Sequence, residues 1–340
     1  MVVPIYLGRE LLKGKHMLFH SSKKPTELHI IHLNKMQDKQ GEKLKHALDD
    51  GQKDSKKCGV LGKFCKKAKD KTKDKQENDD KHSSTKNVFL LDFDGDIKAS
   101  AVDHLREEIS VIISSAKAGD EVVLRLESAG GQVHAYGLAS TQLARIKEAK
   151  LTLTICVDKV SASGGYMMAC VADKIVATPF AIVGSIGVVS QMPNFYEFLK
   201  KHDIDVELFT AGQYKRTVTM FGKNDDDDRA KYQDDLNRIH ELFKNHIKQY
   251  RPNLDIEKLA TGEIWFGSDA LDLGLVDELG TSDAYILKLM KTHDVFALHT
   301  RTKPTLAEKL GFEQMGVKVG NMAGQALSSF GEQLAKYNRP

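Results

Sequence analysis

The sequence predicts an α/β fold built around a mostly parallel sheet. Three observations predict it: short apolar runs recur from residue 87 onward, segments with helical apolar spacing separate them, and glycine-rich turns follow two of the runs. Strands that alternate with helices need right-handed crossovers, which place the strands side by side and parallel. The chain of 340 residues is long enough for one large domain or two modest ones.

The first part of this body alternates regularly between the two kinds of element. The apolar positions of the first helix, such as Val102, Leu105, Ile109 and Ile112, recur at helical spacing. Strands are expected at 88–93, 121–127 and 151–157, and helices at 101–118, at 133–149 and over a short apolar segment that ends near 172.

The later part is less regular but keeps the same alternation. Short strands are expected at 174–177, 182–189, 206–210 and 295–299, and helices at 194–202, 226–250 and 281–293. The acidic run Asp225–Asp228 precedes the longest helix, where negative charge favours the positive end of the helix dipole. We find no internal repeat in the sequence.

Charge divides the chain into a stalk, residues 1–86, and a body, residues 87–340. The stalk has 21 Lys and Arg against 12 Asp and Glu, a net charge of +9, whereas the body carries −6. Residues 35–86 hold few large apolar side chains, so we expect a largely disordered or helical linker with a helix near 42–48. The acidic body argues against nucleic acid as a substrate. The stalk is expected either to contact anionic lipid or RNA or to act as a soluble spacer.

No cofactor, metal or membrane span is predicted. The chain has no run approaching the roughly 18 apolar residues of a membrane span, and its start lacks the order of a signal peptide. Cys58 and Cys65 lie in the stalk, Cys156 and Cys170 lie in apolar runs where a thiol packs as a small hydrophobe, and no Cys-x-x-Cys pair exists. Asp92–Asp96 resembles part of a calcium loop but lacks its distal glutamate.

A serine and a lysine carry the predicted chemistry. Ser163 sits in the small-residue bend Val160–Tyr166, and Lys215 follows 52 positions later in Ala211–Arg216. A bend of this kind exposes a hydroxyl at the end of a strand, and a desolvated lysine can take its proton, which describes a serine hydrolase without a histidine. Neutral lysine at pH 7 needs a pKa depression of roughly three units, from burial or from a nearby positive charge.

Two glycine loops are candidates for stabilising an oxyanion. Ser128–Gly131 and Ser161–Gly165 each follow a predicted strand and precede a helix, at the edge of a parallel sheet where ligands bind. Backbone N–H groups there are unpaired, and two of them aimed at one point form an oxyanion hole. We predict Gly130 or Gly131, together with Gly164, as the donors. Glycine used only for the geometry of ordinary turns is the alternative.

Two further side chains are weighed against structural roles. Ser185, in Gly184–Gly187, is predicted to orient the Lys215 amine by a hydrogen bond, or else to be a small residue in a tight bend. His134 follows the first glycine loop and would be needed for a Ser-His-Asp triad, but no Gly-x-Ser-x-Gly elbow surrounds Ser163. We therefore expect His134 to be solvated or structural.

These residues resemble the signal peptide peptidase A family, and within it the SohB-type peptidases, over about residues 87–300. The resemblance rests on the two glycine loops and on three segments, 183–188, 210–216 and 265–279. It implies a ClpP/crotonase-like fold, Ser163 as nucleophile, Lys215 as general base and Ser185 as the lysine-orienting serine. Ala129 stands where the family's oxyanion loop has proline.

The resemblance also implies partners and a location. Family members cleave peptides, including leftover signal peptides, at membranes, and they assemble as homo-oligomeric rings in which a neighbouring subunit completes the active site. We expect the bacterial inner membrane with the peptidase domain extracytoplasmic, attached through an N-terminal anchor missing from this sequence or through the basic stalk. The alternatives are a crotonase-type acyl-CoA enzyme on the same fold and an inactive membrane-associated scaffold.

Overall fold

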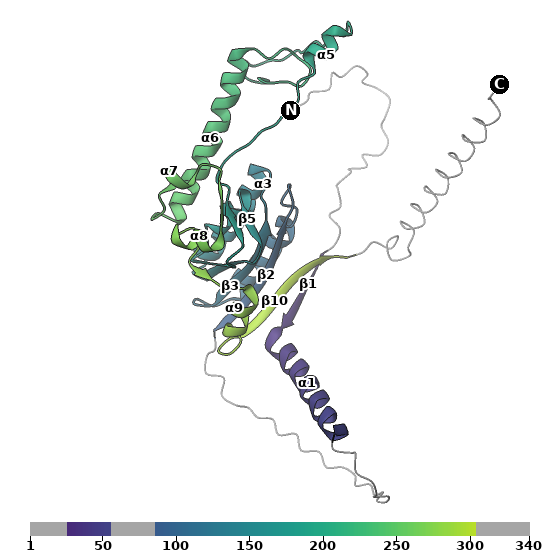
Figure 1. Ribbon diagram of the computed structural model, residues 1–340, viewed down its shortest axis with the longest axis vertical. Coiled ribbons are helices and arrows are strands. Elements are labelled where there is room, and N and C mark those ends of the chain that lie inside the picture. The colour runs from purple at the N-terminus through teal and green to yellow at the C-terminus, as the bar shows by residue number, and fades with distance from the viewer. Residues whose placement is uncertain (1–25, 56–85, 304–340) are drawn as a thin grey trace, which may run out of the picture. The chain divides into compact units, whose positions relative to one another are not determined.

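A computed structural model describes residues 26–55 and 86–303 (Figure 1). The chain divides by its internal contacts into two units, of which Leu28–Thr300 holds the sheet and the candidate site. In the other unit, Met1–Glu27 with Arg301–Pro340, Lys303 forms an ion pair with Glu27 at 3.3 Å. The α/β class with a mostly parallel sheet is confirmed.

Within the described residues, ten strands form one sheet. Its main path runs β1-β10-β2-β3-β4-β6-β9, while β5 branches from β3 to pair with β7, and β7 pairs with β8. The branch is parallel at β3–β5 and β5–β7 and antiparallel at β7–β8. The strands are β1 (Thr26–His32), β2 (Asn87–Gly95), β3 (Glu121–Ser128), β4 (Thr152–Val157), β5 (Val160–Ala162), β6 (Lys174–Ala177), β7 (Ile182–Gly184), β8 (Ile264–Phe266), β9 (Glu278–Leu279) and β10 (Asp294–Thr302).

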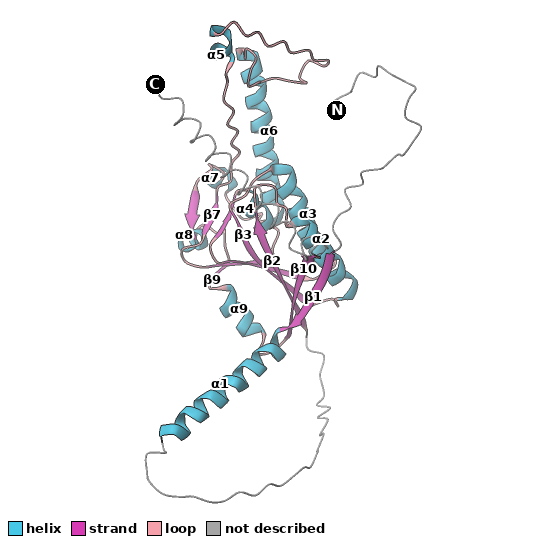
Figure 2. Ribbon diagram, turned by 90° about the vertical axis from the view of Figure 1, so that its right-hand side faces the viewer, coloured by secondary structure: helices cyan, strands magenta, loops and turns pink. Residues whose placement is uncertain are grey.

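Helices cover both faces of this sheet (Figure 2). Alternate residues of β3 face opposite sides, so Val122 and Leu124 join one buried cluster with α2 and α3 while Val123 joins a second with Ile286 of α9. The helices are α1 (Leu33–Ser55), α2 (Val102–Ser115), α3 (Val133–Glu148), α4 (Gly164–Ala169), α5 (Tyr196–Lys201), α6 (Asp226–Tyr250), α7 (Ile256–Leu259), α8 (Gly267–Asp272) and α9 (Ser282–Leu289).

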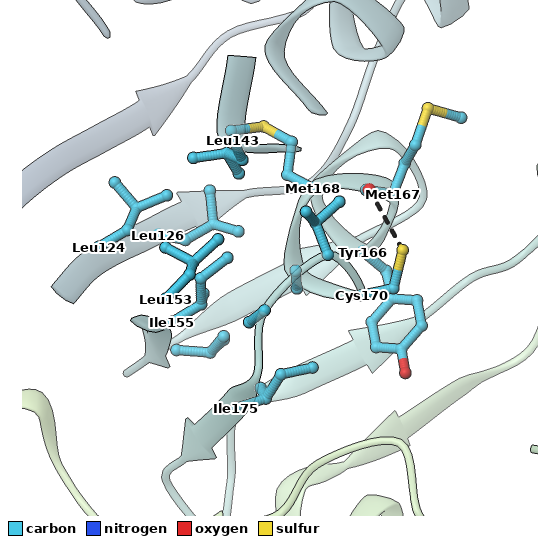
Figure 3. Close-up of a cluster of buried hydrophobic side chains, with 14 of the residues drawn as sticks. Leu124, Leu126, Leu143, Leu153, Ile155, Tyr166, Met167, Met168, Cys170 and Ile175 are labelled. Carbon is cyan, nitrogen blue, oxygen red and sulfur yellow. Dashed lines mark hydrogen bonds between the residues drawn. The ribbon is translucent and has the colours of Figure 1, made fainter. Parts of the chain in front are cut away.

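The short helix α4 is embedded in the larger cluster, and all six of its residues are buried. Figure 3 shows Tyr166, Met167 and Met168 packed among side chains of β3, β4 and α3. The Tyr166 hydroxyl donates to the carbonyl of Leu275 at 2.9 Å, which ties α4 to the chain after α8. A fully buried helix is a rigid base for the residue that precedes it, Ser163.

The cysteines of the body pack as small hydrophobic side chains, as predicted. Cys156 and Cys170 are free and buried, and the Cys170 thiol lies 3.3 Å from the carbonyl of Met167 (Figure 3). Burial raises the pKa of Cys156 to about 12, so its thiol stays protonated and unreactive at neutral pH. Cys58 and Cys65 lie outside the described residues.

Three sequence predictions about elements need correction. Val206–Thr210 is not a strand, because no other strand of the described residues lies alongside to pair with it. The strand expected at 182–189 ends at Gly184, where a positive φ of 94° turns the chain. The N-terminal helix is longer than 42–48, and the strand that precedes it, β1, joins the sheet beside β10.

Helix α6 and the segment before it extend away from the compact sheet layers (Figure 1). We call this preceding segment, residues 189–225, the arm. The start of α6 is fixed as predicted: Asp225 and Asp228 form a reciprocal capping box at its N-terminus. Only Phe243 and Ile247, near its end, are buried, whereas its first turns are exposed or half-buried and contact the preceding segment, with the Tyr232 hydroxyl 2.6 Å from that of Ser190. None of the described helices combines the length and the apolar character that crossing a bilayer requires.

Candidate active site

Ser163 lies at the tight junction between β5 and α4. Its backbone adopts φ 51° and ψ −118°, a conformation that a residue with a side chain rarely adopts. Two hydrogen bonds hold it: the Ser163 N–H donates to the carbonyl of Gly184 at 2.8 Å, and the Ser163 carbonyl accepts from the N–H of Met167 at 3.0 Å. Strain held by its surroundings in this way is typical of functional positions.

The Ser163 side chain opens onto a cleft of about 540 Å³. The cleft is lined on one side by Gly131 and Gly164 of the two glycine loops, and by Ser185. The middle of α6 also lines the cleft, including Asn237 and His240. Four of the residues predicted from the sequence are therefore neighbours around one cavity.

The two glycine loops fit closely into one another. Gly130 has a φ of 91°, and a Cβ there would lie 2.6 Å from the Gly164 nitrogen and 2.7 Å from the Ser163 Cβ. A Cβ on Gly131 would lie 2.2 Å from the carbonyl oxygen of Ile97. These contacts require glycine for close approach of the two backbones.

Fewer backbone N–H groups are available to an oxyanion than the sequence indicated. The N–H of Gly130 donates to Ser128 Oγ at 3.0 Å, so it is already used. The N–H groups of Gly131 and Gly164 have no acceptor among the described residues, and both glycines line the cleft beside Ser163. Gly130 therefore fits a conformational role better than that of a donor.

Ser185 occupies a second bend of the same kind. Its φ is 51°, its N–H donates to the Glu263 carbonyl at 2.6 Å, and its carbonyl accepts from Gly187 at 3.0 Å. The parallel pairing of β5 with β7 places Ala162 opposite Gly184, so Ser163 and Ser185 follow paired positions of adjacent strands. The two serines thus follow the carboxyl ends of neighbouring parallel strands.

Lys215 is not brought to this cleft within the single chain. It lies in the exposed segment between α5 and α6, where its N–H closes a turn on the Gly212 carbonyl at 3.0 Å. It does not line the cleft and forms no hydrogen bond with Ser163 or Ser185. The predicted base and its predicted orienting serine therefore stand in different parts of the chain.

The structure adds one histidine to the site and leaves another outside it. His134 is exposed and does not line the cleft, consistent with the solvated role expected for it. His240 does line it, with Nε2 3.2 Å from the Ile186 carbonyl. Sequence reasoning missed His240 because α6 is polar along most of its length and no motif marks this position.

The acidic run Asp92–Asp96 has structural partners. Asp92 forms a paired hydrogen bond with the Arg125 guanidinium, at 2.6 and 2.9 Å. Asp96 accepts from the backbone N–H and the hydroxyl of Ser100, at 2.8 and 2.9 Å, and these bonds lower the pKa of Asp96. Across the described ranges, no three potential metal-ligating side chains gather in one place.

Family models match most of the chain. The model for "Peptidase family S49" matches residues 145–296, which include Ser163, Ser185 and Lys215. The model for "Peptidase family S49 N-terminal" matches residues 11–143, which include the first glycine loop. The boundary between the two matches falls within α3, between the two loops that meet at the cleft.

Curated relatives agree with this match. The chain is 57% identical over 224 residues to a protein of Haemophilus influenzae named "Probable protease SohB", a match that covers 66% of the chain and 64% of the relative, less than two thirds of its length. It is 52% identical over 227 residues to a protein of the same name from Buchnera aphidicola subsp. Acyrthosiphon pisum, covering 67% of the chain and 68% of the relative. The chain belongs to peptidase family S49, among its SohB-type members.

Proposed function

We propose that this protein is a serine endopeptidase that works with a Ser163–Lys215 dyad. The observation that carries the proposal is the strained Ser163 beside two backbone N–H groups, those of Gly131 and Gly164, at one cleft. Ser163 Oγ attacks the peptide carbonyl carbon while its proton passes to the base, and the N–H groups stabilise the resulting oxyanion. The base then protonates the leaving amine, and water releases the acyl group from Ser163.

Lys215 reaches this chemistry from a second copy of the chain. The arm that bears it exposes large apolar side chains, with Val189 90% and Phe209 87% exposed, and burial of such a surface is a strong drive for association. Docking of the arm on a neighbour would surround the Lys215 amine with apolar groups and lower its pKa. In a closed ring each copy gives its arm to the next and receives one in return.

The substrates proposed are small apolar or signal-peptide-like peptides at a membrane. The cleft offers apolar lining from Met167, Leu236 and Phe243 together with the polar groups around Ser163. The net charge of +9 over residues 1–86 would draw the chain to anionic lipid, and the bacterial inner membrane with an extracytoplasmic peptidase domain is the proposed location.

The membrane proposal predicts that the whole chain binds anionic vesicles and that added salt weakens this binding, because the attraction is electrostatic. Neutral vesicles should not bind the chain.

Ser163→Ala is expected to abolish both peptide cleavage and covalent labelling by a fluorophosphonate, because the attacking oxygen is removed. The fold should persist, since the Ser163 side chain forms no hydrogen bond within the described residues. Mass spectrometry of the labelled wild-type protein should place the adduct on Ser163, and Ser190→Ala, an exposed serine outside the cleft, is the matched control.

The same experiment separates the alternatives. Labelling of Ser163 without any cleavage across a peptide library would support a scaffold that keeps only a reactive serine. No labelling, together with saturable binding of an acyl-CoA, would support a crotonase-type enzyme whose N–H pair holds a thioester. Full activity in Ser163→Ala would refute the proposed nucleophile.

A further inference from the structure

Beneath the first glycine loop lies a chain of buried hydrogen bonds. Ser128, the last residue of β3, is 2% exposed, and Tyr136 of α3 is fully buried. Ser128 Oγ lies 2.6 Å from the Tyr136 hydroxyl and accepts the Gly130 N–H at 3.0 Å. The Tyr136 hydroxyl in turn donates to the carbonyl of Asp96 at 2.7 Å.

The short hydrogen bonds favour one direction, and the other acceptor near the Ser128 hydroxyl, the Gly95 carbonyl, lies at the longer distance of 3.5 Å. The Asp96 carbonyl can only accept, so the Tyr136 proton points to it and Tyr136 Oη accepts from the Ser128 hydroxyl. Ser128 Oγ is then free to accept the Gly130 N–H. Burial raises the pKa of Tyr136, so the phenol stays protonated and the direction is kept at neutral pH.

Tyr136 also touches the second loop through its ring. A Cβ on Gly164 would lie 2.4 Å from Tyr136 Cγ, so the ring packs directly against this glycine. The ring also meets Phe93 edge-on, with ring centroids 6.5 Å apart. One side chain therefore contacts the Gly164 backbone and, through Ser128, sets the turn at Gly130 that precedes Gly131.

The residue that follows the first glycine loop, Gln132, is held by a second backbone hydrogen bond. The Gln132 N–H donates to the Ile97 carbonyl at 2.8 Å, next to the Asp96 carbonyl that receives the Tyr136 hydroxyl. The loop of Gly130 and Gly131 is thus attached on both sides to the turn after β2. Within the loop, the backbone conformation at Gly130 is restrained by the hydrogen bond from its N–H to Ser128 Oγ.

We propose that Tyr136 is a positioning residue for the oxyanion hole: with Ser128 it fixes the direction of the Gly131 N–H, and its ring fixes the Gly164 N–H. The inference rests on the proposed peptidase function and deepens it. Tyr136 does not touch the substrate, because it is fully buried and does not line the cleft. It acts through the two backbone donors.

Tyr136→Phe keeps the ring against Gly164 and removes only the hydroxyl. We expect kcat for peptide cleavage to fall about 10- to 100-fold with KM within about twofold of wild type, because donor alignment matters in the transition state and not in substrate binding. Affinity for a peptide boronate, whose tetrahedral adduct uses the same donors, should fall in parallel with kcat. Ser128→Ala removes the hydroxyl that joins Tyr136 to the Gly130 N–H, so it should lower kcat by a similar factor. The double variant should show no further loss of kcat.

Tyr285→Phe is the matched control. Tyr285 is half-buried and its hydroxyl donates to Glu121 at 2.8 Å, but it lies on α9 and outside the cleft. It should lower thermal stability without changing kcat or boronate affinity. A Tyr136→Phe protein that loses stability as Tyr285→Phe does, yet keeps wild-type kcat and boronate affinity, would overturn the positioning role.

The test distinguishes this inference from the function on which it rests. If wild-type Ser163 reacts with a fluorophosphonate and Tyr136→Phe and Ser128→Ala react at the same rate, the positioning role fails while the peptidase stands. If the wild-type protein neither reacts nor cleaves, both proposals fall. A slower reaction confined to the Tyr136 and Ser128 variants supports the role.

Discussion

Lys215→Ala is expected to lower kcat by about 10²- to 10⁴-fold, the usual contribution of a general base. Its physical reason is that the Ser163 hydroxyl needs an acceptor for its proton, and the cleft formed by one chain holds no lysine among its lining residues. The measurement is cleavage of a fluorogenic peptide alongside fluorophosphonate labelling, which should slow in the same proportion.

The decisive form of this prediction is complementation between two inactive variants. Ser163→Ala and Lys215→Ala proteins, unfolded and refolded together in equal amounts, should regain about one quarter of the wild-type activity, because each site takes serine and lysine from different copies drawn at random. A dyad formed within one chain would give no recovery. Zero recovery in mixed oligomers of wild-type size would therefore contradict the shared site.

Two further variants identify the base. Lys223→Ala, which changes an exposed lysine of the same arm, should leave kcat unchanged. His240→Gln tests the histidine that lines the cleft, and its Nε2 contact with the Ile186 carbonyl predicts an orienting or packing role. If His240→Gln lost activity and Lys215→Ala kept it, the base would be His240 and the arm would serve assembly alone.

Gly164→Ala is expected to damage both stability and activity. Its new Cβ would lie 2.4 Å from Tyr136 Cγ, and the Tyr136 ring is fully buried with no space to retreat. Overpacking of this kind costs roughly 1–3 kcal/mol of unfolding free energy. Displacement of an oxyanion donor lowers kcat by about 10²- to 10³-fold. Chemical denaturation and peptide cleavage measure the two effects.

Gly137→Ala is the matched control for this substitution. Gly137 lies in α3, one residue after Tyr136, and a Cβ there meets no atom within 4 Å. Alanine in a helix interior is favoured over glycine by about 0.5–1 kcal/mol, so this variant should be more stable than wild type and equally active. A Gly164→Ala protein with wild-type kcat would show that the second loop supplies no donor.

Local patterns in the sequence were enough for most of the sheet and for one half of the site. β2, β3, β4 and β6 fall where apolar runs predicted strands, and the serine bend and both glycine loops gather at one cleft. These features depend on residues close together in the chain, such as Ser163 and Gly164. The parallel order of the strands then brings the loop ends to the same edge.

Long-range contacts decided the rest. The sequence did not indicate that β1 joins the sheet, because strand pairing with β10 joins residues more than 260 positions apart. The sequence indicated Gly130 as an oxyanion donor, and only the fold shows that Ser128 Oγ already accepts the Gly130 N–H. Likewise, no sequence pattern near Tyr136 indicated that its side chain contacts Ser128 of the first loop and Gly164 of the second.

The sequence by itself determined the fold class, the serine bend and the glycine loops, because each is a local pattern of residue types. Tertiary structure decided which glycine N–H groups beside the cleft already have an acceptor, that α6 lines the cleft, and that Lys215 does not line the cleft that Ser163 lines. The physical reason is that these outcomes depend on pairing and burial between distant segments. Such contacts are set by the packed whole and not by neighbouring residues.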